Sequence, residues 1–424
     1  MLIIKNVHII DPLNQRNEIN DIALDEDGHI NHIGQIEPQE KDQVYDGTNQ
    51  ICYPGFVDIH VHFRDPGQTH KEDIYTGSLA AAKGGYTHVV CMANTVPVID
   101  SVESYLANQH KMDKLAINVY QAAAISKAFK GEAITDMEAL KKVGVKMLTD
   151  DGIPLKDPSF VKKAMIEASR LNIPLSFHEE DPYFIGKAGV NDGIISQQLG
   201  FKGASQQAEI EMIKRDIELA RETKATINIQ HISSLESLKL VKKAKMEGLN
   251  IHAEACPHHF TLTEQAVLTH GSLAKMNPPL RKEEDRLAIC EALKDGTIDI
   301  IATDHAPHSP EEKNRPLLQA PSGILGLETA YALANEILVR NNYLDDTSLI
   351  ERMALNPGKL VGIRTALDIG ALANLVIVDP NQPWIVENFK SKSQNSPFLH
   401  RKMQGQVMLT IAKGKIVYKI ENDI

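Results

Sequence analysis

"VDIHVHFRDPG", residues 57–67, places two histidines two positions apart in an apolar run that ends at a Pro-Gly pair. Because side chains alternate along a strand, His60 and His62 would lie on one face of it. Two imidazoles at the end of a strand can bind one metal ion, although a chain with 17 histidines contains such pairs by chance. Arg64 adds a cation just beyond the run. The stretch therefore predicts a buried strand with a polar site at its carboxyl end.

Short apolar runs of this kind recur along the chain, separated by longer segments such as "SFVKKAMIEASRLN" (159–172), whose apolar residues have helical spacing. The predicted strands lie near residues 57–62, 87–92, 116–122, 144–149, 174–178, 226–231, 250–255 and 299–303. Eight alternations of strand and helix predict an α/β fold, a (β/α)8 barrel of the triosephosphate-isomerase (TIM) type.

Both ends of the chain read as strands outside this alternation, at 2–10, 19–33, 373–381 and 407–419. They predict a small β-sandwich domain built from both termini, with residues 1–53 and 366–424 in that domain and 54–365 in the barrel. A chain of 424 residues suits one large barrel with a small appendage. The segment 179–203 interrupts the fifth strand and its helix, and could be either a mobile lid or a surface excursion.

Composition excludes several classes of function. The net charge of −11, from 45 basic and 56 acidic residues, argues against non-specific nucleic-acid binding. No apolar run reaches the roughly 18 residues of a membrane span, and the N-terminus lacks a secretory layout. The cysteines are scattered without a CxxC pair, which predicts free thiols and a cytoplasmic location; they are Cys52, Cys91, Cys256 and Cys290.

Polar side chains also follow the other predicted strands. His178 ends the fifth, His231 the sixth and Asp304 the eighth, while Asp150 and Asp151 end the fourth. Catalytic residues gather at this end of such barrels. Burying these groups unpaired would cost several kcal/mol, a cost that a metal ion removes. Nitrogen and carboxylate ligands without thiolate favour Zn²⁺ over Mn²⁺ or Fe²⁺.

The number of candidate ligands predicts two metal ions, since six ligands exceed one open four-coordinate site. The candidates are His60, His62, Asp151, His178, His231 and Asp304. Asp151 is the predicted shared carboxylate. Asp150 points to the other face if strand geometry continues that far, and is the second choice.

Two longer stretches resemble a known family. "DIHVHFRDP" (58–66) and "ATDHAPHSPEEK" (302–313) are similar to the two signature stretches of the class I bacterial dihydroorotases, in the amidohydrolase superfamily. "PGFVD", "CMANTVP", "TDDG", "FHEED" and "PHHF" accompany them in family order, so the resemblance covers essentially the whole chain. It implies a dihydroorotase, which reversibly hydrolyses (S)-dihydroorotate to N-carbamoyl-L-aspartate in de novo pyrimidine (UMP) biosynthesis. It also implies a homodimer and leaves room for a contact with aspartate carbamoyltransferase.

The resemblance implies two zinc ions per subunit, bridged by Asp151 and a water or hydroxide. It assigns the remaining ligands as His60, His62 and Asp304 for the first zinc, and His178 and His231 for the second. Asp304 would also be the catalytic general base and acid. Many amidohydrolases use a carboxylated lysine as the bridge, but the nearest lysine, Lys146, should lie on the opposite strand face from Asp151.

The resemblance also implies a site for the substrate's carboxylate, held by Arg64 and Asn94 with help from His308. A guanidinium fork pairs well with a carboxylate. Asn277 in "KMNPPLR" would bond the ring amide. The other implied substrate-binding residues are His62, Phe63, Ser322 and Gly323. The family commonly has an aromatic residue before this glycine, so Ser322 puts an apolar contact in doubt while backbone contacts can persist.

Other readings stay open at this point. Asn94 and Asn277 could serve only in turns, and Arg64 could pair with Asp65 or Asp73. The chain could be another cyclic amidase, such as a hydantoinase, dihydropyrimidinase or allantoinase, although these generally carry the bridging lysine. It could also be an inactive scaffold that supports a carbamoyltransferase, although such a protein should have lost metal ligands.

Overall fold

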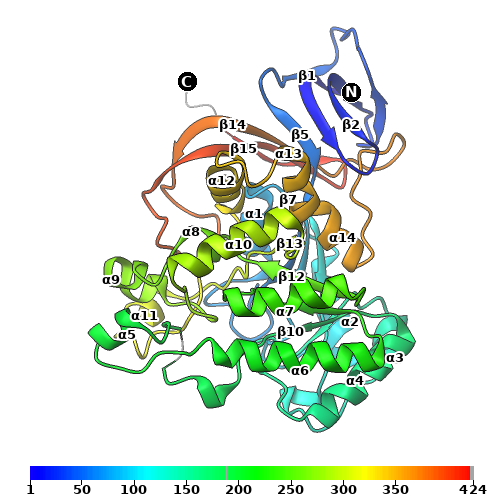
Figure 1. Cartoon of the computed structure of the whole chain (residues 1–424). Coiled ribbons are helices and arrows are strands. Elements are labelled where there is room, and N and C mark those ends of the chain that lie inside the picture. Colours follow the sequence, from blue (N-terminus) through cyan, green and yellow to red (C-terminus); the bar gives the residue numbers. More distant parts are fainter. Residues whose placement is uncertain (188, 421–424) are drawn as a thin grey trace.

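The computed structural model describes residues 1–187 and 189–420, and shows parallel strands surrounded by helices, with a further sheet on one side (Figure 1). The central strands are β6 (Phe56–Val61), β7 (Tyr86–Cys91), β8 (Asn118–Gln121), β9 (Leu148–Thr149), β10 (Leu175–Phe177), β11 (Ile227–Ile229), β12 (Ile251–Ala255) and β13 (Ile300–Ile301). Each of these strands lies close to a strand predicted from the sequence.

The central strands close into a barrel. β6, β7 and β8 form one parallel sheet, and β9 to β13 form another. Isolated bridges join the two sheets, from Ala123 to Leu148 on one side and from Val61 to His305 on the other. Among the described residues the ring therefore has eight strands, and the predicted barrel is confirmed. Its carboxyl ends meet at one face, where the candidate site residues lie.

Helices cover the outside of the barrel, and α4 (Pro158–Leu171) shows why they form. The Asp157 side chain caps its first turn, Pro158 occupies the first helical position, and Asn172 ends it in the left-handed conformation. Its buried face carries apolar residues at helical spacing. The other long helices are α1 (Ile74–Lys83), α2 (Val102–Met112), α6 (Gln207–Thr223), α7 (Leu235–Met246) and α10 (Glu283–Asp295).

Shorter helices fill the loops around these elements. They are α3 (Met137–Lys142), α5 (Ile194–Gln198), α8 (Pro257–Thr261), α9 (Ala266–His270), α11 (Pro310–Lys313), α12 (Ala330–Ala334), α13 (Asp346–Ile350) and α14 (Asn356–Leu360). None of the helices in the described part of the chain has the length and apolar character needed to cross a membrane.

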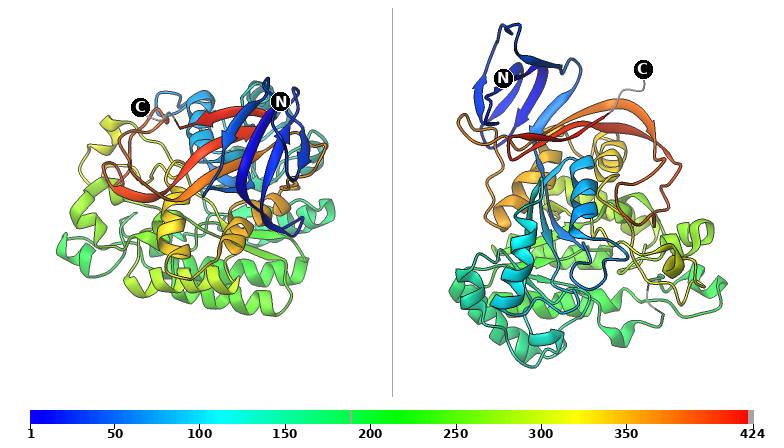
Figure 2. Two further views of the ribbon diagram at one scale, coloured as in Figure 1. Left: turned by 90° about the horizontal axis from the view of Figure 1, so that it is seen from above. Right: turned by 180° about the vertical axis from the view of Figure 1, so that it is seen from behind.

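The second sheet draws its strands from both ends of the chain, as predicted, and lies beside the barrel (Figure 2). Its strand order is β16-β15-β14-β5-β1-β2-β3, and β4 pairs with β1. The strands are β1 (Leu2–Asp11), β2 (Arg16–Leu24), β3 (Ile30–Ile33), β4 (Gln43–Asp46), β5 (Ile51–Pro54), β14 (Leu375–Ile385), β15 (Lys402–Ala412) and β16 (Lys415–Lys419). Apolar side chains of β1, β2, β14 and β15 share a buried cluster of their own. The exact domain limits stay a prediction.

The segment 179–203 contains α5 and is tied to the loops around it. Buried Arg281 donates hydrogen bonds through Nη1 to Asn191 Oδ1 at 2.9 Å and to the Ala204 carbonyl at 2.7 Å. Asn191 in turn donates to Glu264 Oε2 at 2.6 Å. These bonds fix the base of the segment against the barrel, and its closing over a substrate stays a prediction.

Candidate active site

Three of the predicted site residues have an unusual backbone conformation. Arg64, His231 and Asp304 have φ values of 57°, 31° and 46°, and each comes shortly after a barrel strand. Positive φ in a residue other than glycine costs about 1–3 kcal/mol and persists where the surrounding structure enforces it, often at functional sites. Three of the thirteen non-glycine residues with positive φ in the described part of the chain thus follow barrel strands at the carboxyl end.

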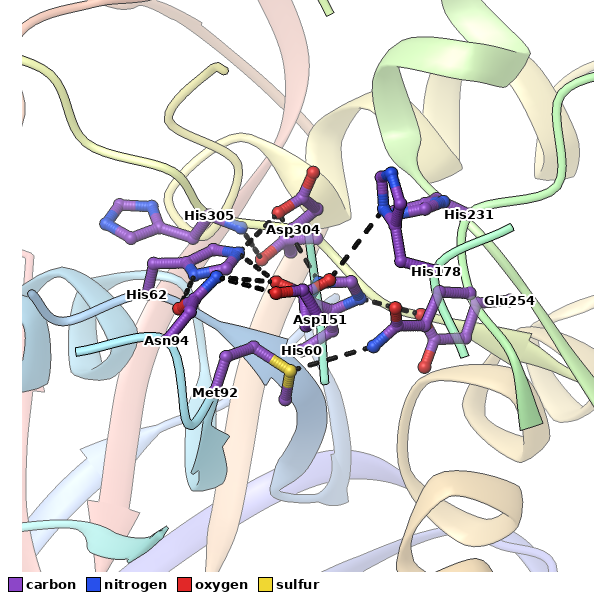
Figure 3. A network of polar contacts seen from close by, with 12 residues as sticks. His60, His62, Met92, Asn94, Asp151, His178, His231, Glu254, Asp304 and His305 are labelled. Carbon is purple, nitrogen blue, oxygen red and sulfur yellow. Dashed lines mark hydrogen bonds and ion pairs between the residues drawn. The ribbon is translucent and has the colours of Figure 1, made fainter. Parts of the chain in front are cut away.

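The side chains of the predicted metal ligands converge at this end (Figure 3). His60 Nε2 lies 3.3 Å from Asp151 Oδ1 and 3.5 Å from Asp304 Oδ1. His62 Nε2 lies 2.9 Å from Asp304 Oδ1 and 3.5 Å from Asp151 Oδ2. Both carboxylates therefore face both imidazoles of the HxH pair.

A second pair of histidines completes the cluster. His178 Nδ1 lies 3.0 Å from His231 Nε2 and 3.9 Å from Asp151 Oδ1. Asp151 groups closely with His60 and His62 on one side and with His178 and His231 on the other. It is therefore placed between the two pairs of histidines, where a shared carboxylate would have to be.

One atom in the cluster shows that these residues fit a metal ion. His60 Nε2 is fully buried, faces Asp151 and Asp304, and has no hydrogen-bond partner. Leaving such a group unsatisfied costs about 1–3 kcal/mol, which coordination to a cation would remove. Imidazole nitrogens and carboxylate oxygens are ligands of Zn²⁺ and of related divalent ions.

The electrostatics of the cluster reflect the close packing of carboxylates and imidazoles. Burial alone would lower the pKa of His60, but Asp151 and Asp304 raise it well above its usual value. The pKa of Asp151 is lowered in spite of burial, because His60 and other histidines lie nearby. Burial, together with neighbouring histidines, lowers the pKa of His231 far below its usual value. In these states Asp151 and His231 can bind a cation directly, whereas His60 would have to lose a proton to do so.

Buried groups behind the ligands hold them in place, and the sequence analysis did not assign this role. Glu254 accepts a hydrogen bond from His60 Nδ1 at 3.0 Å and another from Asn228 Nδ2 at 2.6 Å. Glu180 Oε2 lies 3.1 Å from His178 Nε2. Such partners set the tautomer and the orientation of ligating histidines. The available signal was a glutamate within the otherwise apolar end of β12.

Beside the cluster lies a cavity of about 290 Å³. It is lined by His62, Arg64, Asn94, Asp151, Gly152, His178, His231, Asn277, Asp304, Ala306, His308, Ser322 and Gly323. The structure therefore brings the predicted substrate-binding residues and the predicted ligands to one cavity, with two exceptions. His60 is buried beneath it, and Phe63 does not line it.

Phe63 departs from the expectation for a substrate-binding residue. Its side chain is buried edge-on against His305, and a Cβ at Gly77 would approach the Phe63 ring within 2.4 Å. The ring therefore packs against α1. No contact of the Phe63 side chain with a ligand in the cavity follows from this position, so its substrate-binding role stays a prediction.

The polar residues of the cavity make specific contacts. Asn94 Oδ1 accepts a hydrogen bond from His62 Nδ1 at 3.0 Å, and its Nδ2 donates to Asp151 Oδ2 at 2.9 Å. Asn94 is thus held by the cluster rather than serving only in a turn. Arg64 Nε donates to the Pro307 carbonyl at 3.3 Å, and Nη2 lies 3.5 Å from His308 Nε2. Asn277 Oδ1 accepts from Ser322 Oγ at 3.2 Å.

Two alternatives from the sequence find no support in the described contacts. Asp65 lies 3.7 Å from Lys111 and Asp73 lies 2.6 Å from Lys392, so the ion pairs of both are made away from Arg64. Asp150 accepts hydrogen bonds from the backbone of 125 and 126 at 2.7 and 3.0 Å. Its carboxylate therefore points away from the cluster, as strand alternation predicted.

A second cavity, of about 420 Å³, lies at the opposite end of the barrel, because its lining includes residues just before β9, β10, β11 and β12. Lys146 lines it, with Nζ 5.4 Å from the centre of the Tyr120 ring. This lysine is therefore far from Asp151 and cannot take the bridging position. His258 and His259 are buried beside Cys256, and His259 Nε2 donates a hydrogen bond to the Pro278 carbonyl at 3.0 Å.

The chain is similar to known proteins over almost its whole length. A family model described as "Dihydro-orotase-like" matches residues 49–237. A dihydroorotase from Clostridioides difficile (strain 630) is 51% identical over 420 residues, which is 99% of this chain and all of that one. A dihydroorotase from Clostridium acetobutylicum is 47% identical, again over 99% of this chain and all of that one. The solved L-hydantoinase (dihydropyrimidinase) from Arthrobacter aurescens superimposes with a TM-score of 0.85 at 23% identity, over 99% of this chain and 96% of that one. That last likeness shows the fold alone.

Proposed function

The chain belongs to the dihydroorotase family of the amidohydrolase superfamily, cyclic amide hydrolases of pyrimidine synthesis, and from this premise we propose that it interconverts dihydroorotate and N-carbamoyl-L-aspartate at two divalent metal ions. One observation carries the proposal. Arg64 and the His–Asp cluster open into the same cavity. A cation for the substrate's carboxylate thus lies beside ligands for the metal ions that would assist hydrolysis of the ring amide.

The proposed metal ligands fall into two sets that share Asp151. They are His60, His62 and Asp304 for one ion, and His178 and His231 for the other. The donor chemistry supports Zn²⁺, two per subunit. When bound, the metal ions would lower the pKa of water to near neutrality and polarise the ring carbonyl.

The chain's own residues would place the substrate. Arg64 binds the ring carboxylate in a charge-assisted pair, with Asn94 and His308 beside it. Burial, together with the charge of Arg64, lowers the pKa of His308 to about 3, so this ring is neutral and does not repel the guanidinium. Asn277 bonds the ring amide, while the backbone at 322 and 323 completes the wall. Orientation is then set before the chemical step.

Asp304 would carry the proton. Its carboxylate lies 2.9 Å from His62 Nε2 and faces the cavity, so it can accept a proton from the attacking water. The same proton then passes to the ring nitrogen as the C–N bond breaks, which opens the ring. In the reverse direction Asp304 returns the proton to water as the amide forms, so one residue serves both directions.

The proposal extends to the setting of the enzyme. The four cysteines are free and buried in the structure, which supports a reducing compartment such as the cytoplasm. The family resemblance implies a homodimer and leaves a contact with aspartate carbamoyltransferase open. Size-exclusion chromatography of the protein, alone and mixed with that enzyme, tests both.

The function is tested with purified, zinc-loaded protein. Ring opening is followed with dihydroorotate, dihydrouracil, hydantoin and allantoin, before and after chelation. We expect turnover of dihydroorotate only, lost with the chelator and restored by zinc. Turnover of an uncharged ring instead would retain the metal centre and reject the carboxylate site, and no turnover of any ring with metal bound would favour the scaffold.

A variant tests the residue that gives the ring specificity. Arg64→Met should raise KM for dihydroorotate about ten- to a hundredfold, because a hydrogen bond to a charged group contributes about 1.5–3 kcal/mol. Arg315→Met is the matched control, since Arg315 is exposed and outside the cavity. An unchanged KM in Arg64→Met would remove Arg64 from the carboxylate site.

A further inference from the structure

Two buried lysines bind the carbonyl groups of residues 320–323, the "APSG" loop that lines the cavity. Lys275 Nζ donates to the carbonyl of 320 at 2.6 Å. Lys313 Nζ donates to the carbonyls of 321 and 323 at 3.0 and 3.1 Å. The two lysines are only 5% and 3% exposed, and no ion pair of either occurs among the described residues. Burying an amino group is costly unless it is hydrogen-bonded, and the carbonyl groups of this loop accept hydrogen bonds from both lysines.

A third side chain joins this loop to the neighbouring one. Asn395, 3% exposed, lies between β14 and β15 in sequence. Its Nδ2 donates to the carbonyls of Ala306 and Gly323 at 3.0 and 3.2 Å. Its Oδ1 accepts the backbone N–H of His308 at 3.0 Å. One amide group therefore connects the loop after β13 with the 320–323 loop.

The loops that Asn395 connects contribute one wall to the lining of the cavity, formed by Ala306, His308, Ser322 and Gly323. His308 Nε2 donates to the Ser322 carbonyl at 2.9 Å and lies 3.5 Å from Arg64 Nη2. Gly323 has a φ of 136°, and a Cβ there would come within 2.9 Å of Ala306 Cβ, so the two loops are in close contact. The bonds to the Gly323 carbonyl therefore contribute to the spacing between this wall and the guanidinium, together with the backbone bond from the Ala306 N–H to the Ile324 carbonyl at 2.8 Å.

We propose that Asn395 and Lys313 are positioning residues for the carboxylate end of the substrate site, acting through the Gly323 carbonyl that both of them bind. The inference rests on the proposed function, which places the carboxylate between Arg64 and this wall. Without either donor the wall would shift relative to Arg64. The metal ligands on the other strands would keep their places, and so would Asp304, because the Val61–His305 bridge holds the start of its loop. Substrate binding would weaken without a matching loss of the chemical step.

The first test compares Asn395→Ala with Asn388→Ala, a control in the same segment whose side chain is exposed. In Asn395→Ala we expect KM for dihydroorotate to rise about tenfold, which corresponds to about 1.4 kcal/mol, with kcat within about threefold of the original and metal content unchanged. The control should match the parent protein. A lower melting temperature with unchanged KM would show a structural role only and overturn the inference, as would a fall in kcat at constant KM.

The second test addresses the shared carbonyl. Lys313→Met retains the length of the side chain but not its donor, and leaves the 386–401 segment intact. Both residues bind one oxygen, so their effects should not be independent. The double variant should raise KM by a smaller factor than the product of the factors measured for the two single variants. Fully multiplicative effects would show that they act independently and overturn the inference.

A conservative variant separates the two halves of the Asn395 contact. Asn395→Asp retains an acceptor for the His308 N–H but loses the two N–H donors to the Ala306 and Gly323 carbonyls. Its KM for dihydroorotate should therefore rise as much as that of Asn395→Ala. A KM equal to that of the parent would overturn the assignment to the Gly323 carbonyl. Failure of the proposed function would look different, because Arg64→Met would then leave KM unchanged or the parent would not turn over dihydroorotate.

Discussion

Replacing Glu254 by glutamine should weaken metal binding without removing a single ligand. Glu254 is fully buried and accepts two hydrogen bonds, from His60 Nδ1 at 3.0 Å and from Asn228 Nδ2 at 2.6 Å. A glutamine has one acceptor and one donor end. Whichever way its amide is turned, one end places an NH₂ group against another donor.

The magnitude follows from what the clash does to His60. If the amide NH₂ faces Nδ1, the imidazole must place its proton on Nε2, and that nitrogen can then no longer bind a metal ion. If it faces Asn228 instead, a buried donor loses its partner at a cost of about 1–3 kcal/mol. Loss of such a supporting group typically lowers metal affinity about 10- to 100-fold, or about 1.4–2.7 kcal/mol. We expect a loss of that size.

Zinc affinity of the apoprotein, measured by competition with a chromogenic chelator, checks the expectation. Asn228→Asp in the Glu254→Gln background is the matched rescue, because the new carboxylate accepts from the amide NH₂ and leaves the amide oxygen for His60. The Ser176 hydroxyl, now an acceptor from Asn228 at 2.8 Å, can rotate to donate. Unchanged affinity in Glu254→Gln, or no recovery in the double variant, would refute this account.

Three further outcomes are expected. Asp304→Asn should lower kcat about 10²- to 10⁴-fold, the usual contribution of a general acid–base, with zinc still bound; an unchanged rate would reject the proton-transfer role. Asp151→Ala should reduce zinc per subunit on elemental analysis, and full occupancy would show that the bridge is wrong. Burial, with Lys413 and Lys146, lowers the pKa of His88 to about 4, so stability should be complete above pH 6.5 and fall as the pH approaches 4, by about 3 kcal/mol. In His88→Phe, urea unfolding between pH 7 and 4 should show a smaller loss, and an equal loss would contradict the cause.

The fold was predictable because a barrel repeats one simple pattern. Each buried strand is an apolar run, and each outer helix shows apolar residues at helical spacing, as α4 does. Strand ends and hence the candidate ligands followed from the same pattern, since parallel strands bring their carboxyl ends together. The dihydroorotase family was likewise predicted from two short stretches and is confirmed by relatives over the whole chain.

Contacts between distant segments were not predictable in the same way. Asn228 and Glu254 lie on neighbouring strands, and which of them faces His60 depends on register that the sequence does not display. The packing of the Phe63 side chain against α1 depends on Gly77, where the absence of a Cβ leaves room for the ring. Asn395 reaches the site from beyond β14, across a sequence separation of 87 residues from His308.

That last contact changes how the terminal sheet is understood. Between β14 and β15 the chain leaves the sheet and runs over the barrel, where Ser391 contacts Glu72 and Asn395 contacts the site loops. Glu72 Oε2 in turn lies 3.5 Å from His305 Nε2, next to Asp304 in sequence. Because β14 pairs with β5 and β15, the sheet anchors both ends of this segment. The residues predicted as a small appendage therefore help to hold the active face of the barrel, so the two parts cannot be separated without disturbing the site.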